Sequence, residues 1–255
     1  MLRGKDLLSI HDLSTDEVAE ILDFAAELKT MQKAGVEHKL LAGKTLGMIF
    51  EKSSTRTRVS FEVGIFQLGG TGLFLSSKDL QLGRGEPIKD TARVLSRYLD
   101  GIMIRTFEQA KVEELAKFAK IPVINGLTDL LHPCQVLTDL LTIREHKGKN
   151  FRALKMAYVG DGNNMTNSYL YGAAKVGMTL AVATPENYKP NQKFSRMHLP
   201  TQKRPAQNFL GRKIRLRLSK TPTLSPPTLG RAWVTRPNTT PARKFSRPIK
   251  SIKIF

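Results

Sequence analysis

The feature that most constrains the fold is an alternation of two kinds of segment over residues 1–187. Strand patterns, short and apolar, occur in TLGMIFE, TGLFLS, GIMIR and IPVING. Helix patterns of ten or more residues follow them in VSFEVGIFQLG, EPIKDTARVLSRYL, FEQAKVEELAKFAK and CQVLTDLLTIREHKG. Such alternation predicts βαβ units around a parallel sheet.

A second series begins after the polar stretch KGKNFRAL, with KMAYVGDG, NMTNSYLYGAAKVG and TLAVATP. The sequence therefore predicts an α/β protein with two parallel-sheet α/β domains. Residues 1–150 form the first, and residues 151–187 begin a second that is incomplete. Before the first strand, Ser14 to Glu17 read STDE, a capping box that predicts an amphipathic helix through Glu27.

Most of the net charge of +19 comes from residues 188–255, which carry +17. That segment holds 17 of the 41 Lys and Arg residues, nine of the 13 prolines and no acidic residue, which predicts a disordered basic tail. The other residues carry 24 basic and 22 acidic side chains, so a nucleic-acid surface is not expected there. No apolar run reaches the roughly 18 residues of a membrane span. The single cysteine, Cys134, fits a reducing cytoplasm.

Polar residues follow four of the predicted strands at their carboxyl ends. They are Ser53–Arg58, Arg105, His132–Gln135 and Asp161–Asn164. In open parallel sheets, ligands bind beyond this edge. The sequence therefore predicts one site there.

The stretch Ser54-Thr55-Arg56-Thr57 has the parts of an anion site. The first N–H groups of a helix are unpaired, hydroxyl groups donate, and guanidinium groups bind phosphate oxygens. The alternative is an ordinary helix cap with solvated arginines, and Arg105 could equally be a surface residue with its charge in water.

The stretch His132-Pro133-Cys134-Gln135 offers an imidazole donor and a carboxamide, which could polarise a carbonyl group. The alternative is a turn with a packed cysteine. No metal site is predicted, since no further ligand lies at zinc spacing. Residues 160–164 lack dinucleotide-fingerprint spacing, so no cofactor is predicted.

Four motifs taken together are more specific than any of these stretches alone. They are FEKSSTRTRVSFEVG, LQLGRGEPIKDTARVLSRYLDGIMIRT, LHPCQVLTDLLT and GDGNNMTNS. In this order they resemble the transcarbamylase family, and most closely its ornithine carbamoyltransferase members, over residues 1–187.

The resemblance implies roles for nine residues. Ser54, Thr55, Arg56 and Thr57 would hold the phosphate of carbamoyl phosphate. Arg105, His132 and Gln135 would engage the carbamoyl group, with Arg105 and His132 as the catalytic pair. Gln81 would reach the site of a neighbouring subunit in a homotrimer, and Asn164 would contact L-ornithine.

The implied reaction transfers a carbamoyl group to the δ-amine of L-ornithine, which gives L-citrulline and phosphate in arginine biosynthesis. Two alternatives stay open. One is a transcarbamylase for another amine, such as aspartate or putrescine. The other is a nucleic-acid-binding protein that uses the basic tail.

The family continues with D-x-W-x-S-M-G and H-C-L-P loops, and neither occurs here. In a shifted reading frame, the codons of residues 227–234 permit Asp-Thr-Trp-Ala-Ser-Met-Gly. Two later stretches of the same frame also permit family-like sequence. We therefore expect that residues 188–255 arise from a frame shift soon after Pro190, and that the chain as written is impaired.

Overall fold

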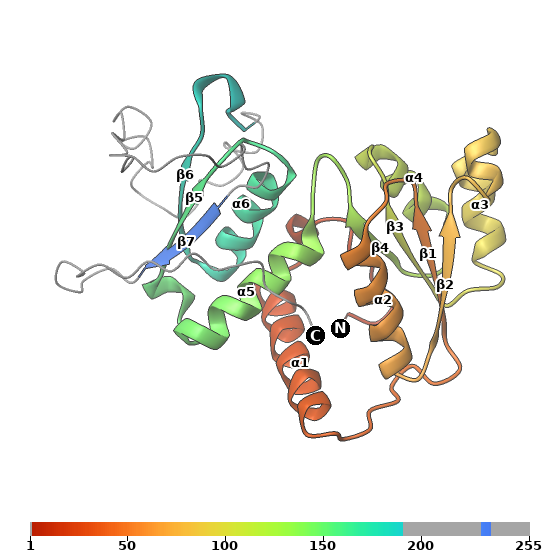
Figure 1. The fold of residues 1–255 in the computed structure, drawn as a ribbon, viewed down its shortest axis with the longest axis horizontal. Helices are drawn as coiled ribbons and strands as arrows, with labels where there is room; N and C mark the ends of the chain where they lie inside the picture. The colour runs from red at the N-terminus through yellow and green to blue at the C-terminus, as the bar shows by residue number, and fades with distance from the viewer. Residues whose placement is uncertain (1, 191–230, 236–255) are drawn as a thin grey trace, which may run out of the picture.

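The computed structural model describes residues 2–190 and 231–235, and their strands form two sheets (Figure 1). The strand orders are β2-β1-β3-β4 and β6-β5-β7. The strands are β1 (Thr45–Phe50), β2 (Thr71–Ser76), β3 (Gly101–Arg105), β4 (Val123–Leu127), β5 (Lys155–Val159), β6 (Thr179–Ala183) and β7 (Arg231–Thr235). The helices are α1 (Thr15–Lys33), α2 (Thr55–Gln67), α3 (Ile88–Leu95), α4 (Gln109–Phe118), α5 (Pro133–Lys147) and α6 (Asn164–Val176). Short 3₁₀ helices are η1 (Ile10–Asp12), η2 (Gln81–Arg84), η3 (Phe151–Ala153) and η4 (Glu186–Tyr188).

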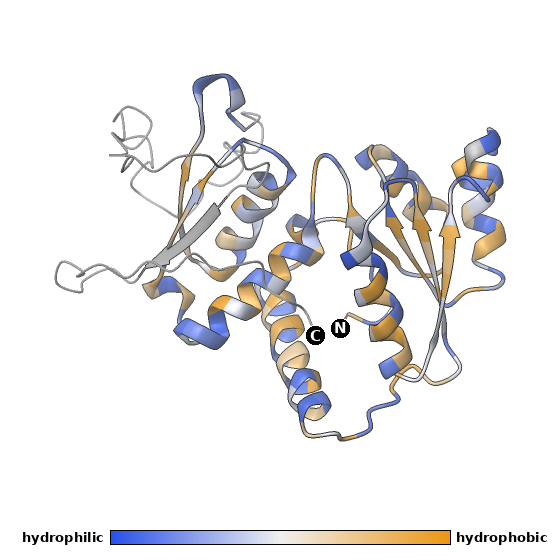
Figure 2. Ribbon diagram, viewed as in Figure 1, coloured by the Kyte–Doolittle hydropathy of each residue, from blue (hydrophilic) through white to orange (hydrophobic). Residues whose placement is uncertain are grey.

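The first sheet is parallel throughout, as the sequence predicts, and helices cover both of its faces. Ile49 and Ile104 belong to a buried cluster that includes residues of α3 and α4. Met48 and Met103, one residue away along each strand, pack with Phe61 of α2 instead. Successive side chains of a strand point to opposite faces, so both faces need apolar residues. Figure 2 accordingly shows the strands of this sheet as largely hydrophobic.

Helix α1 begins at the predicted capping box and runs further than predicted. Ser14 Oγ accepts a hydrogen bond from the Glu17 backbone N–H at 3.0 Å, and the Glu17 carboxylate accepts one from the Ser14 N–H at 2.7 Å. The helix ends at Lys33 rather than Glu27. The reason is local: no helix-breaking residue follows Glu27 until Gly35, whose φ is +66°. No helix of residues 2–190 is long and apolar enough to span a membrane.

Helices α1 and α5 contribute to the apolar core of the second sheet. Val18 and Leu22 of α1 and Leu140 of α5 lie in one buried cluster with Met156 and Tyr158 of β5. In Figure 1, α5 runs from the end of β4 toward the second sheet, and α1 packs against it. Two helices that precede the second sheet along the chain therefore help to form its core.

The second sheet is mixed. Strands β5 and β6 are parallel, as predicted, whereas β7 pairs with β5 in the antiparallel direction. The sequence predicted no strand after residue 187, because basic residues and prolines dominate there. The five residues of β7 read RAWVT, and Trp, Val and Thr favour strands. The rest of the predicted tail, 191–230 and 236–255, lies outside the described residues. The boundaries at 150 and 187, and the frame shift, stay predictions.

Candidate functional site

The ends of β1 and β3 bring two of the candidate segments together. Phe50 and Arg105 are partners in the parallel register, and the next N–H along, that of Glu51, donates to the Arg105 carbonyl at 2.9 Å. The loop after β1 therefore starts beside the last residue of β3. Polar side chains of both segments meet where the buried part of the sheet ends, as the sequence predicts.

Residues Ser54 to Thr57 form the start of α2. Ser54 Oγ accepts a hydrogen bond from the Thr57 backbone N–H at 3.2 Å and donates one to Thr57 Oγ1 at 3.1 Å. Thr55 and Arg56 are exposed, and the first turn of α2 contains no acidic residue. The turn thus combines unpaired helix N–H groups, hydroxyl groups and a guanidinium group, all of which favour an anion.

Arg105 reaches this turn from β3. Its Nε donates to the Lys52 carbonyl at 3.2 Å, and its Nη1 donates to Thr57 Oγ1 at 3.4 Å. Burial lowers the pKa of Arg105, and the nearby charge of Arg56 lowers it further. Within the described ranges, neither guanidinium group has a carboxylate partner. Two positive charges thus lie close together, and no carboxylate of the described residues neutralises them.

Arg58, two residues further along α2, has a different environment. Its Nε donates to Glu62 Oε1 at 3.1 Å, and its guanidinium carbon lies 3.8 Å from the centroid of the Phe74 ring. A carboxylate and an aromatic face already stabilise its charge. Arg56 is therefore the arginine of this turn that remains available for a ligand.

His132 lies at the cap of α5 with its ring mostly buried. Its backbone N–H donates to Ser168 Oγ at 2.8 Å. The ring Nδ1 is buried and has no hydrogen-bond partner among the described residues. Burial, helped by the charge of Arg105, lowers the pKa of His132 to about 4. The imidazole is therefore neutral at physiological pH.

Gln135, in the first turn of α5, is held by a buried carboxylate. Its Nε2 donates to Asp139 Oδ1 at 3.0 Å, and the Tyr169 hydroxyl donates to Asp139 Oδ2 at 2.5 Å. Burial raises the pKa of Asp139. The neighbouring Cys134 donates through its Sγ to the Asn125 carbonyl at 3.4 Å, and burial raises its pKa to about 12. The thiol is thus protonated at neutral pH and unsuited to attack.

Two predicted site residues have other surroundings. Asn164 is at the start of α6, where its Nδ2 donates to the Thr128 carbonyl at 2.7 Å. Its amide thus joins α6 to the loop before His132. Gln81 lies exposed at the start of η2, and no hydrogen bond of the described residues joins its side chain to the other candidates. The predicted roles of both residues remain predictions.

Sequence reasoning did not single out two pairs that complete the site. Lys52 Nζ lies 3.0 Å from Asp129 Oδ1, which ties the loop after β1 to the loop after β4. Ser168, which accepts from the His132 N–H, lies on α6. Lys52 lies in the quoted motif FEKSSTRTRVSFEVG, and Ser168 is the last residue of the quoted motif GDGNNMTNS, but neither motif shows which partner each residue contacts.

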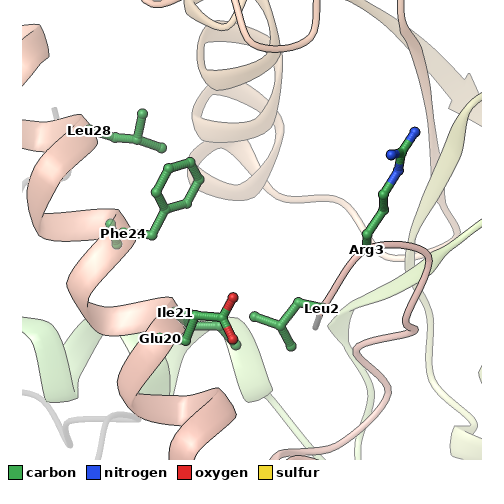
Figure 3. A pocket seen from close by; sticks show the side chains of 7 residues that line it. Leu2, Arg3, Glu20, Ile21, Phe24 and Leu28 are labelled. Carbon is green, nitrogen blue, oxygen red and sulfur yellow. The ribbon is translucent and has the colours of Figure 1, made fainter.

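A separate cavity of about 440 Å³ lies between α1 and the N-terminal segment (Figure 3). Phe24 and Leu28 project from α1 on the side of Leu2. The lining contains none of the nine predicted site residues; it consists of Leu2, Arg3, Glu20, Ile21, Phe24, Ala25 and Leu28. It is a mostly apolar groove rather than an anion site.

Two family models match the chain. The model described as aspartate/ornithine carbamoyltransferase, carbamoyl-P binding domain, matches residues 5–145. The model described as aspartate/ornithine carbamoyltransferase, Asp/Orn binding domain, matches residues 152–213, and so extends past the predicted boundary at 187.

Ornithine carbamoyltransferases are among the similar proteins. That of Carboxydothermus hydrogenoformans is 63% identical over 193 residues, which are 76% of this chain and 62% of the relative. That of Bacillus subtilis is 61% identical over 188 residues, 74% of this chain and 57% of the relative. The chain thus spans about three fifths of the length of these relatives.

Solved structures give the same result. Ornithine carbamoyltransferase from Pyrococcus furiosus is 53% identical with a TM-score of 0.75, and the match covers 77% of this chain and 63% of that one. The first family model alone covers more than half of this chain. The chain therefore belongs to the aspartate/ornithine carbamoyltransferase family.

Proposed function

We propose that the edge of the first sheet binds carbamoyl phosphate, and that the whole protein transfers its carbamoyl group to the δ-amine of L-ornithine. The products are L-citrulline and phosphate, in arginine biosynthesis in the cytoplasm. The similar proteins named ornithine carbamoyltransferase support ornithine over aspartate or putrescine as the acceptor.

One observation carries the proposal. Arg105 and Arg56 lie near each other at the start of α2, and no carboxylate of the described residues pairs with either. Close like charges disfavour one another, and a helix N-terminus favours negative charge, so an anion bound here would relieve the repulsion. A phosphate group would accept hydrogen bonds from both guanidinium groups and from the first N–H groups of α2.

The residues divide the reaction between them. The neutral δ-amine attacks the carbonyl carbon, a C–N bond forms, and the C–O bond to phosphate breaks. Arg105 and the neutral imidazole of His132 would donate to the carbonyl oxygen as it gains negative charge. Arg56 would stabilise the departing phosphate, which takes up the proton that the attacking nitrogen loses. Gln135 would orient the carbamoyl amide, and the remaining gain comes from holding two substrates in contact.

The test compares two arginines of one helix turn. Arg56→Ala should weaken binding of carbamoyl phosphate to the full chain by about 2 kcal/mol, roughly thirtyfold, because a hydrogen-bonded charge is lost. Arg58→Ala is the matched control, since Arg58 is engaged by Glu62 and Phe74, and it should change affinity less than threefold. Calorimetric titration measures both. Equal losses from the two variants would contradict the proposed phosphate site.

We further propose that α2 and β2 form the contact between subunits of a homotrimer. Val59, Val63 and Phe66 are exposed at helical spacing on α2, and Leu73 and Phe74 are exposed on the edge strand β2. Clustered exposed apolar side chains are typical of protein interfaces. Gln81 begins η2, the next element after β2, which is compatible with its reaching a neighbouring site. Light scattering of Phe66→Glu against the unmodified chain tests this, and an unchanged mass would contradict it.

A further inference from the structure

Polar side chains of α6 hold the backbone of the loop that leads to His132. Three side chains at spacing i, i+3, i+4 lie on one face of the helix and each bonds a backbone atom of that loop. The loop comes from the end of the first sheet, whereas α6 follows β5 of the second sheet. The three bonds are Asn164 Nδ2 to Thr128 O at 2.7 Å, Asn167 Nδ2 to Leu130 O at 3.1 Å, and His132 N to Ser168 Oγ at 2.8 Å.

The bonds are part-buried, and two of the α6 side chains that make them are buried. Ser168 is 1% exposed and Asn167 is 5% exposed. Water therefore cannot easily replace either partner if one is removed, and the group left behind would be buried without a hydrogen bond. The restraint on the loop is accordingly stronger than that of a surface contact.

Ser168 is the α6 residue that is hydrogen-bonded to His132 itself. The carbonyl of His132 belongs to α5, where it accepts from the Val136 N–H at 3.4 Å. The ring Nδ1 has no partner among the described residues. The earlier part of the loop is tied to the segment that follows β3, through the Asp129 N–H to the Phe107 carbonyl at 2.8 Å. Ser168 is thus the group that ties the backbone of His132 to the second sheet.

We propose that Ser168 and Asn167 are positioning residues that set where the His132 imidazole lies relative to the carbamoyl end of the ligand. The inference rests on the proposed function. Residues of α2 and β3 would bind the phosphate group. The three bonds from α6 involve neither of these elements. Loss of the α6 bonds should therefore weaken recognition of the carbamoyl group and leave recognition of phosphate intact.

The experiment measures the affinities of the full 255-residue chain for carbamoyl phosphate and for inorganic phosphate. Ser168→Ala should lower the ratio of the two affinities about tenfold while phosphate affinity stays unchanged. Asn167→Leu removes the donor to Leu130 at similar volume and should act in the same direction. Ser168→Thr, which keeps the hydroxyl group, should restore most of the ratio.

Ser96→Ala is the matched control. Ser96 Oγ also accepts from a backbone N–H of another segment, that of Lys120 at 3.0 Å, but at the opposite edge of the sheet, before β4. The control should leave the ratio unchanged. An unchanged ratio in Ser168→Ala, or an equal loss for both ligands, would overturn the positioning role.

A second readout separates this inference from the proposed function. The NMR signal of the His132 ring, assigned by its loss in His132→Gln, should shift in Ser168→Ala without ligand and stay in place in Ser96→Ala. If the unmodified chain shows no preference for carbamoyl phosphate, the proposed function fails and the NMR result alone decides the positioning role. An unshifted His132 signal in Ser168→Ala would then overturn it.

Discussion

At the scale of single residues, the site is a place where cationic groups are close and unbalanced. Burial is the main reason that the pKa of Arg105 is lowered, and Arg56 adds to it. Arg105 adds in turn to the burial that lowers the pKa of His132 to about 4. Each effect disfavours positive charge in the unliganded protein. An anion at the start of α2 would reverse that cost, so binding and folding stability are coupled here.

The buried histidine gives a prediction for stability against pH. The ordinary pKa of 6.5 applies to the unfolded chain, and about 4 applies to the folded one. Between these values the unfolded chain binds the extra proton, so His132 favours unfolding increasingly as pH falls below 6.5. From pH 7 to pH 5, the unmodified chain should lose about 2 kcal/mol more unfolding free energy than His132→Gln.

Urea unfolding at the two pH values measures this difference. His146→Gln, which replaces an exposed histidine at the end of α5, is the control and should behave as the unmodified chain does. Equal pH dependence in the unmodified chain and in His132→Gln would show that the ring is not held neutral by the fold.

At the scale of elements, the close packing of α6 on α5 decides how the site is held. Gly172 of α6 is buried, and an added Cβ would lie 2.6 Å from Val136 Cγ1 and 3.4 Å from Leu140 Cδ1. Val136 is fully buried and β-branched, so it has little freedom to move. The absence of a side chain at Gly172 lets the helices approach closely enough for the α6 side chains to reach the loop at 128–132.

Gly172→Ala should therefore lower the free energy of unfolding. Overpacking costs about 1–3 kcal/mol, and the better helix propensity of alanine offsets roughly 1 kcal/mol of that cost. Gly64→Ala in α2 is the matched control, because an added Cβ there meets nothing within 4 Å. It should be neutral or stabilising by up to about 1 kcal/mol. Urea unfolding compares the two variants, and a Gly172→Ala chain as stable as Gly64→Ala would refute the close contact.

At the scale of the whole molecule, an element that precedes the first sheet along the chain packs in the core of the second sheet. Helix α1 near the start of the chain packs with α5 and α6 and shares a buried cluster with β5, so this part of the chain helps to form the core beside the second sheet. The chain nevertheless spans about three fifths of the length of its ornithine carbamoyltransferase relatives. In the function proposed above, phosphate recognition would involve residues of the first sheet, whereas positioning of a second substrate would need more of the second half.

We therefore predict that the 255-residue chain binds carbamoyl phosphate but forms no citrulline from carbamoyl phosphate and ornithine. The D-x-W-x-S-M-G and H-C-L-P motifs that the family resemblance places around ornithine are absent from the sequence. The assay compares this chain with a version whose reading frame is restored after Pro190, and aspartate and putrescine serve as alternative acceptors. Comparable turnover of ornithine by both chains would contradict the prediction.

The sequence by itself determined the order of elements and the location of the candidate anion site. Strands β1 to β6 were predicted because buried parallel strands require short apolar runs between helices. The segment Ser54–Thr57 was found for a similar reason, since its polar groups come where a strand ends and a helix begins. Both signals are local, so they can be read from neighbouring residues alone.

Only the tertiary structure decided which side chains support that site. Ser168 is 36 residues from His132 and Asn164 is 36 residues from Thr128, and no periodicity links such positions. The difference between Arg56 and Arg58 also depends on a contact with Phe74, a residue of another element. The antiparallel strand β7 was missed as well, because pairing depends on which sheet edge is open. Contacts between elements follow from how closely helices and strands pack, which the local pattern of polar and apolar residues does not specify.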